Sequence, residues 1–269
     1  MQGIDLAGWA FKPLAVAALI AGLGLPLPAR AQTAQPTCDA ALDLTRLVHP
    51  LSRVAHKLSI HEPITIVAIG SSSTAGAGAS SPMASYPSRL AAELKQRFPN
   101  QPIVVINRGV NGEEVGDMLK RFDTAVVAAK PDLVLWQLGT NSVIRDHMFD
   151  DRGASIRAGL KIIRGIGADV VLIDPQFVPK VIVKPEATHM VELIASTAKQ
   201  EDADLFRRFE VMKRWHDVDH QQFETFVSPD GLHLNDWGYA CMAKGLSLAI
   251  ADAAQRPVLS ATAAQHLVP

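Results

Sequence analysis

An aspartate and a histidine near the carboxyl-terminal end of the chain have the types and spacing of a general base and the group that orients it. Asp230 precedes His233 by three residues, on a glycine-containing segment that leads into a predicted helix. At this spacing a carboxylate can accept the imidazole Nδ1–H, which leaves Nε2 free to face a nucleophile. The same spacing also occurs in ordinary surface turns, so the interpretation requires a nucleophile elsewhere in the chain.

Three consecutive serines, Ser71, Ser72 and Ser73, supply candidate nucleophiles directly after the apolar run 64–69. The lysine of a phosphate-binding loop does not follow the glycines of this segment. The G-x-S-x-G pattern of the α/β-hydrolases is absent as well. Taken alone, the serines are more typical of a polar loop with a capping hydroxyl. Together with His233 as a base, one of them becomes a candidate nucleophile.

Two further loops combine glycine with asparagine. One is Asn107-Arg-Gly109-Val-Asn-Gly112 and the other is Gly139-Thr-Asn141. Glycine lets a backbone N–H approach a ligand closely, and an asparagine amide adds a side-chain donor, which are the parts of an oxyanion hole. Each loop taken singly is more typical of a turn.

These loops have to be brought together by the elements that precede them. Apolar, β-branched runs predict strands, and segments with helical spacing of apolar residues alternate with them. The strands are predicted at 64–69, 103–106, 133–138 and 170–173, with a weaker one at 203–208, and the helices at 42–58, 86–98, 113–129, 152–166, 186–199 and about 236–254. This order predicts one doubly wound α/β domain with a parallel sheet covered on both faces. Ligands of such sheets bind beyond the carboxyl ends of the strands, where all the candidate loops begin.

The set of motifs resembles the four sequence blocks of the SGNH (GDSL-type) hydrolase family. The blocks are G-x-S-x-x-x-G after the first strand, N-x-G-x-x-G after the second, G-x-N after the third and D-x-x-H-L-N-x-x-G-Y before the last helix. They occur in order and span essentially the whole chain after its first residues. The last block is the most specific of the four.

The resemblance implies a three-layer α/β/α, flavodoxin-like fold with a five-stranded parallel sheet, and neither a metal nor an organic cofactor. It implies Ser72 as nucleophile, His233 as base and Asp230 as its orienting group. The oxyanion donors would be Ser72 and Gly109 through backbone N–H groups, and Asn141 through its amide. The sequence departs from the GDSL pattern at two positions: Ser71 stands where GDSL members usually have Asp, and Ser142 follows Asn141 where many have Asp. These two departures leave the subfamily, and with it the substrate, open.

Composition narrows the class of partner. The chain has 269 residues, 48% of them hydrophobic, and a formal net charge of -1. Binding of nucleic acid needs clustered Lys and Arg, which this balance does not provide. Small molecules, sugars or lipids are the expected partners, and the sequence leaves the oligomeric state open.

The first 31 residues have the order of a secretory signal peptide. An uncharged apolar run, 13–29, is followed by the small-residue site Ala29-Arg-Ala31. The run is shorter than the ~18 to 20 residues of a membrane span, so no stable membrane insertion is expected after cleavage. We therefore expect residues 1–31 to be removed on export to the periplasm or the medium. Residues 32–269 would form a single domain, with a core at about 38–255 and a frayed tail.

Cys38 and Cys241 are the only cysteines of the chain. In an oxidising compartment the two can form a disulfide, and the alternative is one buried and one exposed free thiol.

Further polar residues are candidates for a substrate pocket or a metal site. His147 and Gln176 follow the third and fourth strands on the side of the candidate loops and are candidates for the substrate pocket. His216 and His220, four apart and beside two aspartates, have the spacing of metal ligands on a helix, but a solvated polar segment is the favoured interpretation.

The expected function is that of an exported serine esterase, most simply a short-chain (acetyl) esterase acting on a carbohydrate. The alternatives are a lysophospholipase or thioesterase for longer acyl chains, an acetyltransferase that uses the same triad, and a catalytically silent carbohydrate-binding domain of the same fold.

Overall fold

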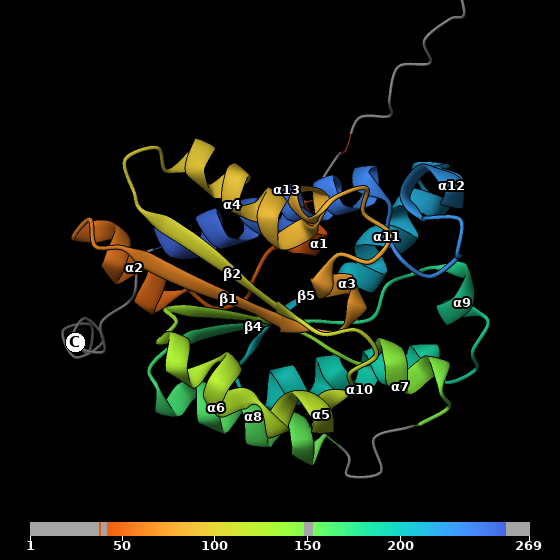
Figure 1. Ribbon diagram of the computed structural model, residues 1–269, viewed down its shortest axis with the longest axis horizontal. Helices are drawn as coiled ribbons and strands as arrows, with labels where there is room; N and C mark the ends of the chain where they lie inside the picture. Colours follow the sequence, from red (N-terminus) through yellow and green to blue (C-terminus); the bar gives the residue numbers. More distant parts are fainter. Residues whose placement is uncertain (1–37, 39–41, 148–152, 257–269) are drawn as a thin grey trace, which may run out of the picture. The chain divides into compact units, whose positions relative to one another are not determined.

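Five parallel strands in the order β2-β1-β3-β4-β5 form the centre of the fold (Figure 1). They are β1 (Ile64–Gly70), β2 (Ile103–Gly109), β3 (Leu133–Gln137), β4 (Asp169–Ile173) and β5 (Asp204–Phe206). This order is the flavodoxin-like one, and it confirms the predicted fold class. The computed structural model describes Cys38 and residues 42–147 and 153–256. The predicted signal peptide and most of the predicted carboxyl-terminal tail lie outside the described residues.

Helices cover both faces of the sheet (Figure 1). The long helices α4 (Tyr86–Arg97) and α13 (Asp236–Gln255) lie on one face, and α8 (Ala154–Gly165) and α10 (Ala187–Gln200) lie on the other. The shorter ones are α1 (Leu42–Thr45), α2 (Ser52–Ser59), α3 (Ser72–Ala75), α5 (Val115–Lys120), α6 (Phe122–Ala125), α7 (Thr140–Ile144), α9 (Pro179–Ile182), α11 (Arg208–Asp217) and α12 (Phe223–Phe226), with 3₁₀ turns at Pro82–Ala84 and Val127–Ala129. Because both faces are covered, β1 and β3 are apolar and buried along almost their whole length.

Two of the predicted helices differ from those observed, and a further helix was not predicted. The helix predicted for 42–58 is two short helices, α1 and α2, because Pro50 lies between them and proline lacks the N–H that a helix interior needs. The helix predicted for 113–129 begins at Val115 and is interrupted at Arg121, whose backbone leaves the helical region. A helix that the prediction did not include, α11, follows β5 directly.

A disulfide joins Cys38 to Cys241 in α13, with the two Cα atoms 5.5 Å apart. The bond closes a loop of 203 residues and so ties the start of the described chain to its last helix. By restricting the unfolded chain, a loop of this size stabilises a fold by roughly 5 kcal/mol in the chain-entropy estimate.

Aspartates at the starts of three strands hold the segment before β1 against the amino ends of the sheet. Asp204 accepts hydrogen bonds from the backbone N–H groups of Val48 and His49, at 2.6 and 3.0 Å. Asp169 accepts those of Arg53 and Val54, at 3.2 and 3.0 Å, and thereby satisfies donors in the first turn of α2.

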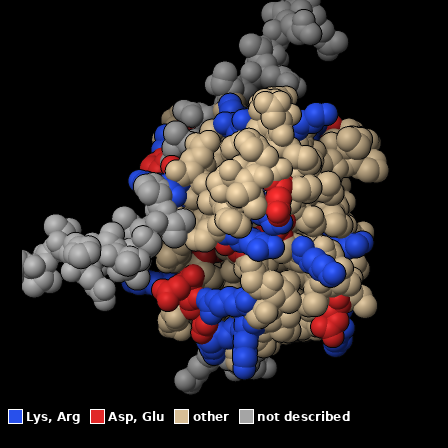
Figure 2. Space-filling model, turned by 90° about the vertical axis from the view of Figure 1, so that its left-hand side faces the viewer, with Lys and Arg blue, Asp and Glu red and all other residues tan. Residues whose placement is uncertain are grey.

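Asp132, just before β3, completes this row. It accepts the backbone N–H of Thr65 and the Arg53 side chain, both at 2.9 Å. On the face at which the strands begin, acidic and basic side chains are interspersed, without a broad patch of one sign (Figure 2).

None of the helices in the described part of the chain is long and apolar enough to cross a membrane.

Candidate active site

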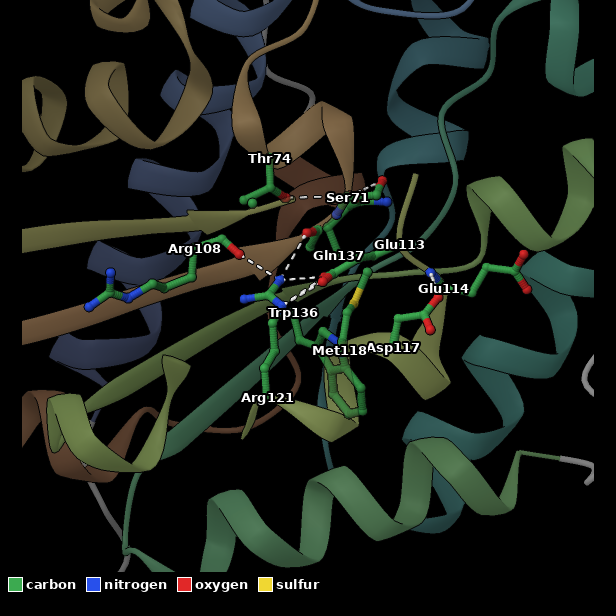
Figure 3. Close-up of polar contacts among 12 residues, drawn as sticks. Ser71, Thr74, Arg108, Glu113, Glu114, Asp117, Met118, Arg121, Trp136 and Gln137 are labelled. Carbon is green, nitrogen blue, oxygen red and sulfur yellow. Dashed lines mark hydrogen bonds and ion pairs between the residues drawn. The ribbon is translucent and has the colours of Figure 1, made fainter. Parts of the chain in front are cut away.

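Ser72 is the first residue of α3, directly beyond the carboxyl end of β1. The sharp turn between strand and helix depends on Gly70, where a Cβ atom would lie 2.2 Å from Thr74 Oγ1. Ser71 precedes the helix, and its backbone N–H and hydroxyl both donate to Gln137 Oε1, each at 2.9 Å (Figure 3). Gln137, at the end of β3, therefore anchors the turn that carries Ser72.

Ser72 and His233 meet although 161 residues separate them. Ser72 Oγ lies 2.8 Å from His233 Nε2, and His233 Nδ1 lies 2.5 Å from Asp230 Oδ2. The three side chains thus form a continuous hydrogen-bonded chain from hydroxyl to carboxylate. This is the geometry in which an imidazole can take a proton from a serine while the carboxylate fixes its tautomer.

Asp230 is held in a network of donors. Its Oδ1 accepts the Ser228 hydroxyl at 2.7 Å and the backbone N–H groups of Leu232 and His233 at 2.9 Å each. Partial burial raises the pKa of the Asp230 carboxyl, but the hydrogen bonds from His233, Leu232 and Ser228 outweigh it and hold the pKa well below its usual value. The carboxylate is therefore ionised throughout the neutral range.

The amino-terminal end of α13 fastens the histidine segment to the serine loop. Asn235 caps the helix by accepting the Gly238 backbone N–H at 3.0 Å. Tyr239 Oη donates to the carbonyl of Ala77 at 2.7 Å, and Asp236 accepts the backbone N–H of Ser80 at 2.8 Å. These contacts fix the distance between His233 and Ser72.

Gly109 lies behind the nucleophile helix. Its backbone N–H donates to Asn107 Oδ1 at 2.9 Å, and a Cβ atom there would lie 2.1 Å from the backbone N of Ala75. Gly109 is thus needed for the close packing of β2 against α3, and its N–H already has an acceptor. The family resemblance implies an oxyanion role for this N–H, but in the structure it is bound to Asn107.

The second glycine of the same loop has a different environment. Gly112 has a φ of +79°, and its N–H has no hydrogen-bond acceptor among the described residues. Glu113 follows Gly112 in the chain, and its carbonyl accepts a hydrogen bond from the side-chain amide of Asn141, at the start of α7, at 2.9 Å. The N–H of Ser72 also has no acceptor among the described residues, because it lies in the first turn of a helix.

The two candidate pocket residues have different environments. Gln176 is 1% exposed, and its amide joins Thr140 Oγ1 at 2.8 Å to the carbonyl of Leu232 at 3.2 Å. Its side chain therefore supports the histidine segment from within and does not line an open pocket. The His147 side chain is 64% exposed and lies 3.2 Å from Glu114 Oε1.

Glu114 was not recognised from the sequence. Besides His147, it accepts Arg145 Nη1 at 2.8 Å and the Ser142 hydroxyl at 3.2 Å. Partial burial raises the pKa of Glu114, and the hydrogen bonds from Arg145, His147 and Ser142 outweigh it and lower that pKa below its usual value. The carboxylate binds α7 to the loop of Gly112.

His216 is engaged in an aromatic cluster. Its ring stacks on that of Phe223 with centroids 4.3 Å apart, and its Nδ1 lies 2.8 Å from Asp217. The described residues contain no cluster of three or more His, Cys, Asp or Glu side chains placed to hold a metal ion.

The model of the non-GDSL lipase-like family matches residues 37–256. The chain belongs to the non-GDSL lipase-like family. The narrower GDSL-type assignment expected from the sequence is not confirmed, since the matching family is described as lying outside that type. Ser71, in the position usually occupied by Asp in GDSL members, is the departure in the sequence that agrees with this.

One segment of the chain is similar in sequence to a known esterase. The chain is 37% identical over 54 residues to an acetylxylan esterase from Geobacillus stearothermophilus, an alignment that covers 20% of the chain and only 25% of that protein.

Solved structures share the fold at low sequence identity. A two-domain esterase active on acetylated mannans has 17% identity and a TM-score of 0.66, over 82% of this chain and 58% of that one. A catalytic mutant of an acetylxylan esterase from Geobacillus stearothermophilus also has 17% identity, with a TM-score of 0.61 over 70% of this chain and 94% of that one.

Proposed function

We propose that this family member is a carboxylic ester hydrolase in which Ser72 is the nucleophile, His233 the general base and Asp230 its orienting group. The observation that carries the proposal is the pair of contacts that His233 makes, 2.8 Å to Ser72 Oγ and 2.5 Å to Asp230 Oδ2. A base placed between a hydroxyl and a buried or hydrogen-bonded carboxylate is the arrangement that activates serine for acyl transfer.

The reaction follows from these groups. His233 Nε2 accepts the Ser72 proton as Oγ attacks the ester carbonyl, and the ionised Asp230 stabilises the imidazolium. His233 then donates that proton to the leaving alkoxide, which leaves an acyl group on Ser72. Water attacks the acyl-enzyme by the same route, with His233 again accepting and returning the proton, and the acid is released. Neither step calls for a metal or an organic cofactor.

The oxyanion formed in each step needs donors that have no other partner. We assign this role to the N–H groups of Ser72 and Gly112 and to the second amide hydrogen of Asn141. Gly112 replaces Gly109 in this assignment because the N–H of Gly109 is already bound to Asn107. Asn141 is oriented beside Gly112 through its bond to the Glu113 carbonyl.

The substrate we propose is a short acyl group, above all acetyl, on a carbohydrate. The support comes from the names of the similar proteins, an acetylxylan esterase and an esterase active on acetylated mannans. Arg145 and His147, partly and largely exposed beside the loop of Gly112, are the proposed contacts for the alcohol part. We further propose that residues 1–31 direct export and that residues 32–269 form the mature single-domain protein.

A series of p-nitrophenyl esters from acetate to palmitate, with an acetylated xylan and an acetylated mannan alongside, tests this function. We expect the rate to fall sharply beyond butyrate and acetate to be released from the polysaccharide. A rate that rises with the length of the acyl chain would contradict an acetylesterase and indicate a lysophospholipase or thioesterase. Acyl transfer to sugar that outpaces hydrolysis would indicate a transferase.

A fluorophosphonate probe separates the enzyme from a silent binding domain. We expect the folded wild type to be labelled and the Ser72→Ala variant to remain unlabelled. The neighbouring Ser71→Ala variant is the matched control and should still be labelled. Absence of labelling in the folded wild type would contradict the proposed mechanism.

A further inference from the structure

Arg121 lies in the break between α5 and α6, and its guanidinium binds the loop that follows β2 (Figure 3). Its Nε donates to both carboxylate oxygens of Glu113, at 2.7 and 2.9 Å, and its Nη2 donates to one of them as well. The same Nη2 donates to the carbonyl of Arg108 at 2.8 Å. A bidentate pair of this kind is both strong and geometrically specific.

The partners of Arg121 belong to the segments that carry the proposed chemistry. Arg108 lies at the end of β2, and Glu113 follows Gly112, the proposed oxyanion donor. The carbonyl of Glu113 accepts the Asn141 amide, so the position of Glu113 also sets the position of Asn141. One guanidinium thus fixes both ends of the loop from which the oxyanion donors are presented.

The loop is also connected to the nucleophile strand at this point. Val110 N–H donates to the carbonyl of Gly70 at 3.0 Å, and Arg121 Nη2 approaches the same carbonyl at 3.5 Å. Gly70 stands two residues before Ser72. A shift of the Arg121 guanidinium would therefore change the spacing between the nucleophile and the oxyanion donors.

The Arg121 and Glu113 side chains are largely shielded, at 20% and 13% exposed. They lie beneath the loop, with their charges satisfied by each other and by the backbone. A pair at the other end of the sheet, Arg53 and Asp132, has a similar N···O distance of 2.9 Å but ties α2 to the residue before β3, away from the proposed site. This second pair is the internal reference for a purely structural ion pair.

We propose that Arg121 and Glu113 are positioning residues for the acyl-transfer reaction. Through the loop 108–113 they hold the Gly112 N–H and the Asn141 amide at the distance from Ser72 that an oxyanion requires. The inference rests on the proposed function. Misplacement of a reacting group by about 1 Å is enough to lower a rate on the order of 100-fold.

The first test measures kcat and KM for p-nitrophenyl acetate. Arg121→Gln and Glu113→Gln are expected to lower kcat by roughly 10- to 100-fold with KM changed less than about threefold, since only the transition state carries the oxyanion. Arg121→Lys keeps the charge but loses the planar fork, so it should lose most of the same activity while remaining folded. The matched control Arg53→Gln should keep kcat within about twofold.

The second test is a double-mutant cycle with Asn141→Ala. If Arg121 acts by placing the oxyanion donors, Arg121→Gln should lower kcat much less in the Asn141→Ala background than in the wild type. Additive losses, or an unchanged kcat in folded Arg121→Lys and Glu113→Gln, would overturn the inference. Ser72→Ala measured in parallel distinguishes failure of this inference from failure of the proposed function. If Ser72→Ala retains turnover, the proposed function itself fails.

Discussion

The two ends of the sheet use the same device with different results. At the amino ends, Asp132, Asp169 and Asp204 accept backbone N–H groups of neighbouring segments. At the carboxyl ends, Asn107 and Gln137 accept the backbone N–H groups of Gly109 and Ser71 in the same way.

The difference is in what remains unbound. At the carboxyl ends, the N–H groups of Ser72 and Gly112 have no acceptor among the described residues. The first belongs to the proposed nucleophile itself, and the second belongs to the loop that follows β2. Side chains at the amino ends of the strands thus hold an adjoining segment in place. Side chains at the carboxyl ends hold the loops so that the N–H groups of Ser72 and Gly112 stay available for a ligand. Substitutions at the two ends should accordingly separate stability from activity.

Ser72→Ala should give the largest effect on activity. Loss of the nucleophile is expected to lower kcat on the order of 10⁵- to 10⁶-fold, while the free energy of unfolding changes by no more than about 1 kcal/mol. Hydrolysis of p-nitrophenyl acetate and urea denaturation measure the two quantities. Near wild-type turnover in this variant would remove Ser72 from the mechanism.

Asn141→Ala should come next. Removal of one oxyanion donor lowers kcat by about 10² to 10³. The matched comparison is Asn107→Ala, which removes the acceptor of the Gly109 N–H and leaves the proposed donors in place. We expect the Asn107 variant to lose more stability and less kcat than the Asn141 variant. Equal losses of kcat in the two variants would contradict the assignment of Asn141.

Asp132→Ala tests the amino end. It leaves the partly buried Thr65 N–H without its acceptor, which should lower the free energy of unfolding by about 1 to 3 kcal/mol. The Michaelis parameters of the folded protein should stay close to those of the wild type. A kcat reduced as strongly as in Asn141→Ala would show that the two ends are not separable.

The smallest expected effect is a difference in pH dependence. Burial raises the pKa of Asp169 to about 6, despite the hydrogen bonds from Val54 and Arg53. A raised carboxyl pKa adds stability that is fully present below the unfolded-state pKa of about 4 and is lost as the pH rises through about 6.

The lowered pKa of Asp230 has the opposite sign, since its contribution is present above about 4 and is lost as the pH falls. Urea denaturation of wild type, Asp169→Asn and Asp230→Asn between pH 3 and pH 8 compares the two ends. We expect the Asp169 variant to remove a decline of roughly 1 to 2 kcal/mol between pH 4 and pH 6. The Asp230 variant should instead flatten the loss on the acid side, and identical profiles for both would rule out the difference.

The sequence predicted the strands well because each one is an apolar run between turn residues. Even the weak fifth strand was placed correctly, at Asp204–Phe206 within the predicted 203–208. The helix break at Pro50 had a visible signal in the proline. The helix α11 had none, since its mixture of charged and apolar residues is only weakly amphipathic and its formation depends on packing of Phe209, Met212 and Trp215.

The candidate site shows a different limit of sequence reasoning. The motif N-x-G-x-x-G contains two glycines, and the pattern does not say which N–H is left without an acceptor. That distinction depends on the Asn107 side chain, whose amide donates to the carbonyl of Thr74 in α3 while its Oδ1 accepts the Gly109 N–H. Gln137 had a detectable signal, as a polar residue near the end of an apolar strand, whereas the buried position of Gln176 could be established only from its partners in space.

The bond between Cys38 and Cys241 has a consequence for the order of events during synthesis. Its second cysteine belongs to the last helix, so the bond cannot form until nearly the whole domain has been made. A chain that stops before α13 leaves Cys38 without its partner and lacks His233 or its supporting helix as well. The oxidised state is therefore a mark of a chain that has been made through its last helix.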